Sequence, residues 1–208
     1  MKLSGSDYMT PDEFRQLLRE KTVAEIVEKH VVTDDPGPFI SNDAIDFFKE
    51  KIRAVFQLQQ NSLLDVIVVG SAKLGFSFLE KPARNGAPYK PAYRAYQSGV
   101  SDVDVAIASP DLYEKIWRDL CRYGAAQSKF PWRTDVGSYM FHGWIRPDKF
   151  PLERPQRCLD WNRVVNEVSR SRHFRYKQLR CAIYHSKWFL ETYQQRGIGM
   201  AQQAEQKL

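Results

Sequence analysis

Apolar residues recur at helical spacing towards both ends of the chain and at strand spacing in its middle. Thr10, Pro11 and Glu13 have the form of a helix N-cap, a first-turn proline and a capping-box acid. They predict a helix over 11–20, and the apolar positions that follow favour a second short helix over 22–30.

A loop and a longer helix are expected next. The prolines and the glycine of 31–40 interrupt the periodicity, and Ser41 or Asn42 is suited to cap the helix that follows. The apolar residues of this helix recur every three or four positions, which gives it one face for packing against a sheet. These residues are Ile45, Phe48, Ile52, Val55 and Phe56.

Three short segments have the composition of β-strands. They are LLDVIVV at 63–69, VDVAIAS at 103–109 and SYMFHGWI at 138–145. Further helices are expected from Ser109 or Pro110, over 159–168 and over 183–193, whereas the polar end at 200–208 is expected to fray.

These elements predict an α/β fold in a single domain, with a small mixed sheet and the first two strands at its centre. N-terminal helices occupy 1–60, and the core of the domain occupies 61–150. Within the core, 80–100 is rich in proline, glycine and tyrosine and has no periodicity, so we expect an insertion loop there. Residues 151–208 are expected to form a basic helical extension.

Composition narrows the class of protein. With 208 residues, 43% hydrophobic and 27% charged, the chain can form one globular domain and is unlike disordered, collagen-like or disulfide-scaffold sequences. No apolar run approaches the ~20 residues of a membrane span, and the N-terminus lacks a signal-peptide core. The three cysteines and four histidines are scattered, which argues against a zinc site. We therefore expect a cytoplasmic protein with free thiols and no membrane association.

The net charge of +6 is unevenly divided along the chain. Residues 1–80 hold nine Lys and Arg against 13 Asp and Glu, whereas 81–208 hold 22 against 12. The densest stretch, 154–180, has eight basic residues, two acids and three aromatic residues. Basic residues interleaved with aromatics suit a phosphate-rich partner such as RNA, DNA or a nucleotide. A solvated helix face is the alternative.

The end of the first strand has features of a phosphate-binding turn. A strand that ends at Gly70-Ser71 and turns at once into a helix presents free backbone N–H groups and the positive end of the helix dipole. Gly70 allows close approach of a phosphate, the Ser71 hydroxyl can donate a hydrogen bond, and Lys73 adds charge. The string GSAKLG lacks the P-loop and dinucleotide-binding patterns, so by itself it also fits a simple helix N-cap.

Two carboxylates begin the second strand. Asp102 and Asp104 are spaced by two, so both project from one face, with Cα atoms ~6.5 Å apart. Neighbouring carboxylates repel each other unless a cation lies between them. Oxygen ligands of this kind suit Mg²⁺ or Mn²⁺, which also bind nucleotide phosphates. A solvated strand end is the alternative for the pair alone.

Two patterns together resemble the nucleotidyltransferase superfamily related to DNA polymerase β. The first is hhhGS at the entry to a helix, and the second is a later strand of the form SDxDhhh, where h is a hydrophobic residue. The resemblance covers about 66–120 and rests on Gly70, Ser71, Asp102 and Asp104. It implies that Gly70 and Ser71 bind the triphosphate of an NTP and that the two acids bind divalent ions. The strings GSAKLGFSF and SDVDVAIASPDLYEKIW are also similar to small bacterial nucleotidyltransferase-like proteins, which implies a role in toxin–antitoxin or antiviral defence.

Two features depart from the family pattern. The family's gap between the glycine-serine pair and the first acid is short, whereas 30 residues separate Ser71 from Asp102, so the insertion loop is expected beside the site. Active members usually have a third carboxylate on a later strand. Asp135 is the best match, ahead of Asp148 and Asp160, and a chain with two of the three acids is the alternative.

The leading hypothesis is a metal-dependent nucleotidyltransferase, in which Asp102, Asp104 and Asp135 are catalytic. It would transfer NMP from an NTP to a hydroxyl of an RNA 3′ end, a protein side chain or a nucleotide. Two alternatives keep the scaffold without transfer: a module that binds nucleic acid or a partner protein, and a sensor that binds NTP. A homo-oligomer is a further possibility. Trp117, Trp161 and Trp188 lie on predicted helices and favour core or interface positions over base stacking.

Overall fold

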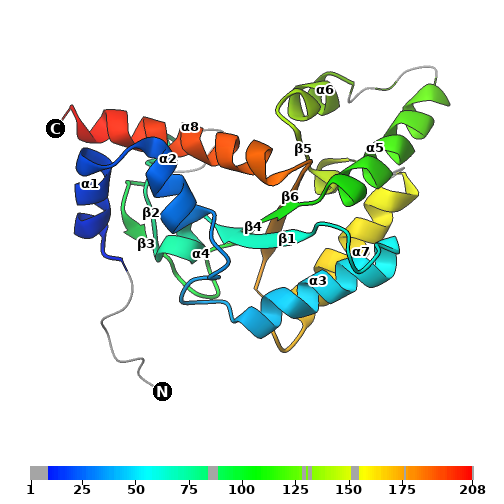
Figure 1. Ribbon diagram of the computed structural model, residues 1–208, viewed down its shortest axis with the longest axis horizontal. Coiled ribbons are helices and arrows are strands. Elements are labelled where there is room, and N and C mark those ends of the chain that lie inside the picture. Colours follow the sequence, from blue (N-terminus) through cyan, green and yellow to red (C-terminus); the bar gives the residue numbers. More distant parts are fainter. Residues whose placement is uncertain are drawn as a thin grey trace.

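A computed structural model describes residues 9–83, 89–127, 130, 133–150, 155–175 and 177–207. Within these ranges the fold is mixed α/β, with eight α-helices, a four-stranded mixed sheet and a two-stranded sheet (Figure 1). The helices are α1 (Pro11–Glu20), α2 (Val23–Ile26), α3 (Asn42–Phe56), α4 (Ser71–Leu74), α5 (Pro110–Ala125), α6 (Arg133–Phe141), α7 (Gln156–Arg170) and α8 (Lys187–Glu205). No helix of the described ranges is both long and apolar enough to cross a membrane.

The main sheet has the strand order β1-β4-β6-β5. Its strands are β1 (Asp65–Val69), β4 (Val103–Ala108), β5 (Trp144–Ile145) and β6 (Leu179–Tyr184). β4 is antiparallel to β1 and parallel to β6, and its register places Asp104 between Val69 and Arg180. The two predicted strands are therefore adjacent, but only β4 is central, because β1 lies at the edge of the sheet.

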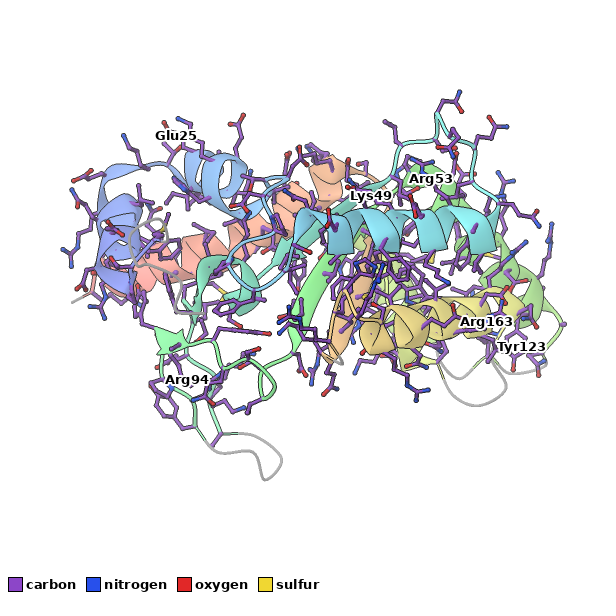
Figure 2. All side chains as sticks on the ribbon, turned by 90° about the horizontal axis from the view of Figure 1, so that it is seen from below. Glu25, Lys49, Arg53, Arg94, Tyr123 and Arg163 are labelled. Atoms are coloured by element: carbon purple, nitrogen blue, oxygen red, sulfur yellow. The ribbon has the colours of Figure 1, made fainter. Side chains whose placement is uncertain are left out.

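Helices cover both faces of this sheet. α3, α5 and α7 lie over one face, and α1, α2 and α8 lie over the other (Figure 1). Figure 2 shows α3 and α7 side by side, with side chains filling the space between them. There the buried Trp161 of α7 packs against Phe48 and Phe56 of α3, with ring centroids 6.2 Å apart in each pair.

Local capping signals predicted the helix starts correctly. Thr10 forms a complete capping box with Glu13 at the start of α1. The Ser41 side chain caps α3 and the Ser109 side chain caps α5, each accepting a hydrogen bond from a backbone N–H of the first turn. A π-helical turn, η1 (Val27–Val31), extends α2, which accounts for the predicted helix over 22–30.

The prediction of a strand over 138–145 was wrong. Helix α6 occupies 133–141, and only Trp144 and Ile145 form strand β5. A turn at Gly143, with φ +70°, separates the two elements.

The predicted helix over 183–193 is confirmed from Lys187 onwards, whereas 183–186 are not helical, and the prediction that 200–208 frays was wrong as far as Glu205. Residues 179–184 form β6 within the sheet, so the segment 151–208, predicted as a helical extension, also provides a strand of the main sheet. Helix α8 begins only at Lys187 and continues to Glu205, which is buried and accepts a hydrogen bond from Arg19 of α1 at 2.5 Å. This ion pair joins the two ends of the chain and stabilises the last turn of α8.

The predicted insertion loop is partly ordered by pairing of its backbone. β2 (Phe76–Ser77) pairs with β3 (Arg94–Ala95), and an isolated bridge joins Lys81 to Lys90. The side chain of Tyr96 is buried in the core against Phe39. Residues 84–88 of this loop lie outside the described ranges.

Candidate functional site

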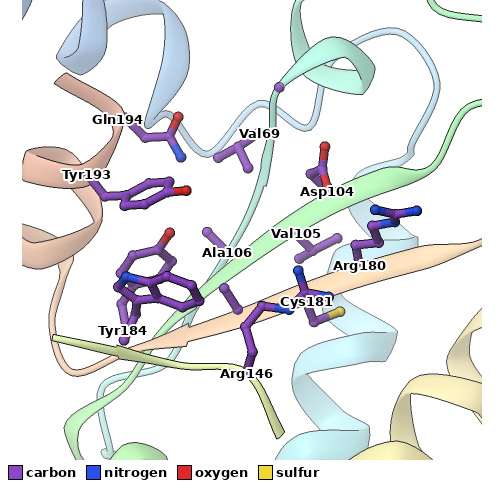
Figure 3. Close-up of a pocket in the computed structure, with 13 residues that line it drawn as sticks. Val69, Asp104, Val105, Ala106, Arg146, Arg180, Cys181, Tyr184, Tyr193 and Gln194 are labelled. Carbon is purple, nitrogen blue, oxygen red and sulfur yellow. The ribbon is translucent and has the colours of Figure 1, made fainter. Parts of the chain in front are cut away.

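A cavity of about 260 Å³ lies where β1 ends beside β4 and β6. Figure 3 shows that charged groups gather on one side of it and aromatic rings on the other. The charged side contains Asp104, Arg146 and Arg180, and the aromatic side contains Tyr184 and Tyr193. The ring of Trp144, which also lines the cavity, has its centroid 6.4 Å from that of Tyr184 and 5.7 Å from that of Tyr193. Val69, Gly70, Val105, Ala106, Cys181, Ala182 and Gln194 complete the lining.

Gly70 forms the turn that closes the end of β1. Its backbone has φ +68° and ψ −146°, a conformation that residues with a β-carbon rarely adopt. A β-carbon at this position would lie 3.2 Å from Oδ2 of Asp104. The glycine therefore allows the backbone to pass close to the Asp104 carboxylate.

The helix after Gly70 is shorter than the phosphate-binding prediction assumed. α4 contains four residues, so it forms a single turn with little dipole. Ser71 is its first residue and is half-buried, and it does not line the cavity. Of the predicted phosphate-binding residues, Gly70 is the one that the structure places at the cavity.

Asp104 presents a carboxylate to the cavity. Burial raises the pKa of this carboxyl, while the charges of Lys81 and Arg180 act in the opposite direction. No described residue donates a hydrogen bond or forms an ion pair with it. A half-buried carboxylate without a hydrogen-bond partner fits a divalent cation as an oxygen ligand, because a bound cation would compensate for the lost hydration.

Asp102 lies on the same side of the strand as Asp104 but has a partner. Its carboxylate forms an ion pair with Arg180 of β6 at 2.5 Å. Asp104 and Arg180 are paired in the parallel register, so their side chains share one face of the sheet. The structure thus brings together the two predicted acids and adds an arginine.

Arg146 is a second arginine at the cavity that the sequence reasoning missed. It follows β5 and is held by Asp148, with Nε and Nη2 donating to the carboxylate at 3.0 and 2.5 Å. This hydrogen bonding raises the pKa of Arg146. The guanidinium is therefore a permanent positive charge at a fixed place in the lining, suited to a phosphate group.

Cys181 also lines the cavity, but its side chain belongs to the hydrophobic core on the face of the sheet towards α3, α5 and α7. Burial raises the pKa of its thiol well above the usual range, so it stays protonated. It is therefore a packing residue and not a nucleophile.

The structure places Lys73 away from the cavity, which corrects its predicted role. The side chain is buried, and its ammonium donates to the Thr33 hydroxyl at 2.6 Å and to the Asp35 carbonyl. Lys73 thus fastens the loop at 31–40 to α4. Its charge faces that loop instead of a phosphate at the turn.

Asp135 also lies elsewhere. It is an exposed residue in the first turn of α6 and does not line the cavity. Of the weaker candidates, Asp148 is engaged by Arg146, and Asp160 on α7 forms ion pairs with Arg157 and Arg163. In the described part of the chain, no group of three His, Cys, Asp or Glu residues is arranged to hold a metal ion.

Comparison of the chain with models of protein families, with curated proteins and with solved structures finds no match. The function of the chain is therefore inferred from the geometry of the cavity and from the two sequence segments that meet there.

Proposed function

We propose that the cavity binds a nucleoside triphosphate with Mg²⁺ or Mn²⁺, and that the protein is a nucleotidyltransferase. The observation that carries this proposal is the unpartnered Asp104 carboxylate, which lies against the Gly70 turn in a cavity that also holds Arg146 and Arg180. The strand order supports it, because the two segments that resemble the nucleotidyltransferase pattern lie on adjacent strands. The two-sided lining supports it as well, because a nucleotide has a charged end and an aromatic end.

Each group has a role that follows from its chemistry. Arg146 and Arg180 bind phosphate oxygens, and the Gly70 turn allows the phosphates to approach the backbone. Asp104 would hold the divalent cation. Asp102 would join it once Arg180 leaves their ion pair and binds the phosphates. The cation neutralises phosphate charge when bound. The rings of Trp144, Tyr184 and Tyr193 provide apolar surface for the base.

The reaction is the transfer of NMP to a hydroxyl. The acceptor oxygen bonds to the α-phosphorus, the bond from that phosphorus to the β-phosphate oxygen breaks, and pyrophosphate leaves. The hydroxyl proton passes to water. The protein contributes by placing the two reactants in line and by stabilising the charge that develops on the phosphates.

Nucleotide binding without transfer is the second candidate. It is favoured by the ion pair between Arg180 and Asp102, which neutralises one of the two predicted metal ligands. It is also favoured by the absence of a metal-holding group of three among the described residues. In this case the chain acts as a sensor or binding module that responds to an NTP.

A transfer assay tests the first candidate. Purified protein is incubated with each α-labelled NTP, Mg²⁺ or Mn²⁺, and either total RNA or cell lysate. We expect label to move to RNA, to a protein or into a small product, and to be lost in the double variant D102A/D104A. Asp135→Ala is the matched control, because this acid is exposed and does not line the cavity, and it should retain activity.

Thermal stability separates the two candidates. Binding of an NTP with its cation to the folded state raises the Tm in a concentration-dependent way. A shift in Tm without transfer of label supports the second candidate and contradicts the first. Neither a shift nor transfer with any of the four nucleotides would contradict both.

A further inference from the structure

An exposed aromatic patch lies next to the cavity. It consists of Phe141 and His142 at the end of α6, and of Trp188, Phe189 and Tyr193 in the first two turns of α8. Phe141 is 82% exposed, Trp188 63% and Tyr193 42%. Large apolar side chains gathered at this exposure mark a surface that binds a partner.

The patch is held in place by close packing beneath it. Gly143, with φ +70°, brings the turn after α6 against the ring of Phe189, and a β-carbon at Gly143 would overlap that ring. Trp188 contacts Phe189 edge-on at 4.9 Å between ring centroids, and Phe141 contacts His142 at 5.2 Å. Phe189 therefore gives the patch a packed base, and Trp188 lies against it.

The charged side chains at the patch are mainly cationic, although Glu191 lies one helical turn after Lys187 on α8. The aromatic side chains enclose a small cavity of about 110 Å³ that Arg196 also lines, and no acidic residue is in its lining. Lys187 is exposed at the start of α8 beside Trp188. Neither Arg196 nor Lys187 forms an ion pair with a described residue. Exposed rings with free cations beside them suit stacked bases and phosphates.

The patch is continuous with the candidate active site. Tyr193 lines both the small cavity of the patch and the larger cavity that contains Asp104. A chain that lies on the patch can therefore bring its end to the charged groups at Arg146 and Arg180.

We propose that the aromatic patch binds single-stranded nucleic acid and directs its end into the cavity. The role of this strand as the acceptor of NMP rests on the proposed function, whereas its binding to the patch does not. Trp188 and Phe141 stack on bases, and Arg196 and Lys187 contact the backbone phosphates. Trp188 is exposed and so is not a core residue, whereas Trp161 is buried in the core.

Fluorescence anisotropy without added nucleotide tests the proposal. The probes are labelled oligouridine and oligothymidine of about 12 nucleotides, a length that spans a typical single-strand site. We expect W188A and F141A each to weaken binding about tenfold, and the double variant to weaken it further. Arg196→Gln should weaken binding and reduce its dependence on salt concentration.

Two controls distinguish stacking from a loss of fold. Trp117→Ala removes a tryptophan that is 41% exposed on α5, outside the patch, and should leave the affinity unchanged. Trp188→Phe retains an aromatic ring and should recover most of the binding. The probe that binds more tightly identifies the strand as RNA or DNA.

Equal affinities of the wild type, W188A and F141A would overturn the proposal. A second result would also overturn it: the wild type binds neither probe and sediments as a dimer, and W188A dissociates that dimer. The patch would then be a protein interface. Failure of the proposed function gives a different result. Strand binding would still depend on Trp188, but no NTP would shift the Tm.

Discussion

The two faces of the main sheet are built from the same strands but are packed differently. On the face towards α3, α5 and α7, the strands present large branched side chains that are almost fully buried. On the other face, β4 and β6 present alanines next to charged and aromatic residues. These are Asp104, Ala106, Ala108, Arg180, Ala182 and Tyr184.

This difference explains where the cavity forms. Large side chains fill the first face and leave no room for a ligand, whereas Ala106 and Ala182 leave space between the Asp104 end of the strands and the aromatic rings. Both faces therefore carry a hydrophobic core, but only the second also leaves room for a cavity, at its Asp104 end. Four substitutions test this difference between the two faces, and their expected effects on stability decrease from the first to the last.

Trp161→Ala on the packed face should have the largest effect. Trp161 is 1% exposed and contacts two phenylalanines of α3, so its loss leaves a large cavity. We expect the free energy of unfolding to fall by about 3–5 kcal/mol in chemical denaturation. A loss below about 1 kcal/mol would show that the space between α3 and α7 is not the main core.

Gly70→Ala should cost less stability but remove the site. The new β-carbon meets Asp104 and strains a backbone with φ +68° and ψ −146°, which we expect to cost about 1–3 kcal/mol. The NTP-dependent shift in Tm should be lost as well. Gly75→Ala is the matched control, because Gly75 also has a positive φ, of +88°, but has open space around its would-be β-carbon. If both variants keep the shift, Gly70 is not part of a binding site.

Asp104→Asn should stabilise the protein in the absence of metal. Burial raises the pKa of Asp104 in the folded state, so its contribution to stability is fully present below the ordinary pKa of 3.8 and is lost as pH rises through the raised value. Asparagine has no carboxyl group to ionise, so the variant does not lose stability in this way as pH rises. The Tm difference between the variant and the wild type should therefore increase with pH over this range, and Mg²⁺ should raise the Tm of the wild type alone. A wild type that is more stable than the variant at neutral pH without metal would contradict this explanation.

Arg180→Gln should have the smallest effect on stability. The arginine side chain is 52% exposed, and such ion pairs contribute at most about 1 kcal/mol. Removing its charge frees Asp102, so we expect tighter binding of Mn²⁺ alone and weaker binding of NTP, both measurable by calorimetry. Arg163→Gln, which breaks an exposed ion pair on α7, should change neither. Unchanged Mn²⁺ affinity in the Arg180 variant would show that Asp102 is not a metal ligand.

Sequence patterns predicted the elements whose signals are local. The Thr10 capping box and the Ser41 and Ser109 caps depend on side chains within one turn of the helix start, so each could be predicted without knowledge of the fold. The strands β1 and β4 were recognisable because their apolar runs are short, β-branched and bounded by turn signals.

Strand β6 shows why other elements could not be predicted. Its residues LRCAIY also fit the beginning of a helix, and only pairing with β4 and β5 makes them a strand. The same pairing placed Arg180 beside Asp104, although 76 positions separate them. No local pattern reports a contact of this kind.

The sequence by itself determined that Asp102 and Asp104 share one face of a strand and that a glycine turn ends the strand before it. These features follow from the two-residue repeat of a β-strand and from the backbone freedom of glycine. Only the tertiary structure decided that Arg146 and Arg180 join the acids, that Lys73 faces a loop, and that Asp135 is remote. These positions depend on strand order and helix packing, which bring together residues that are distant along the chain.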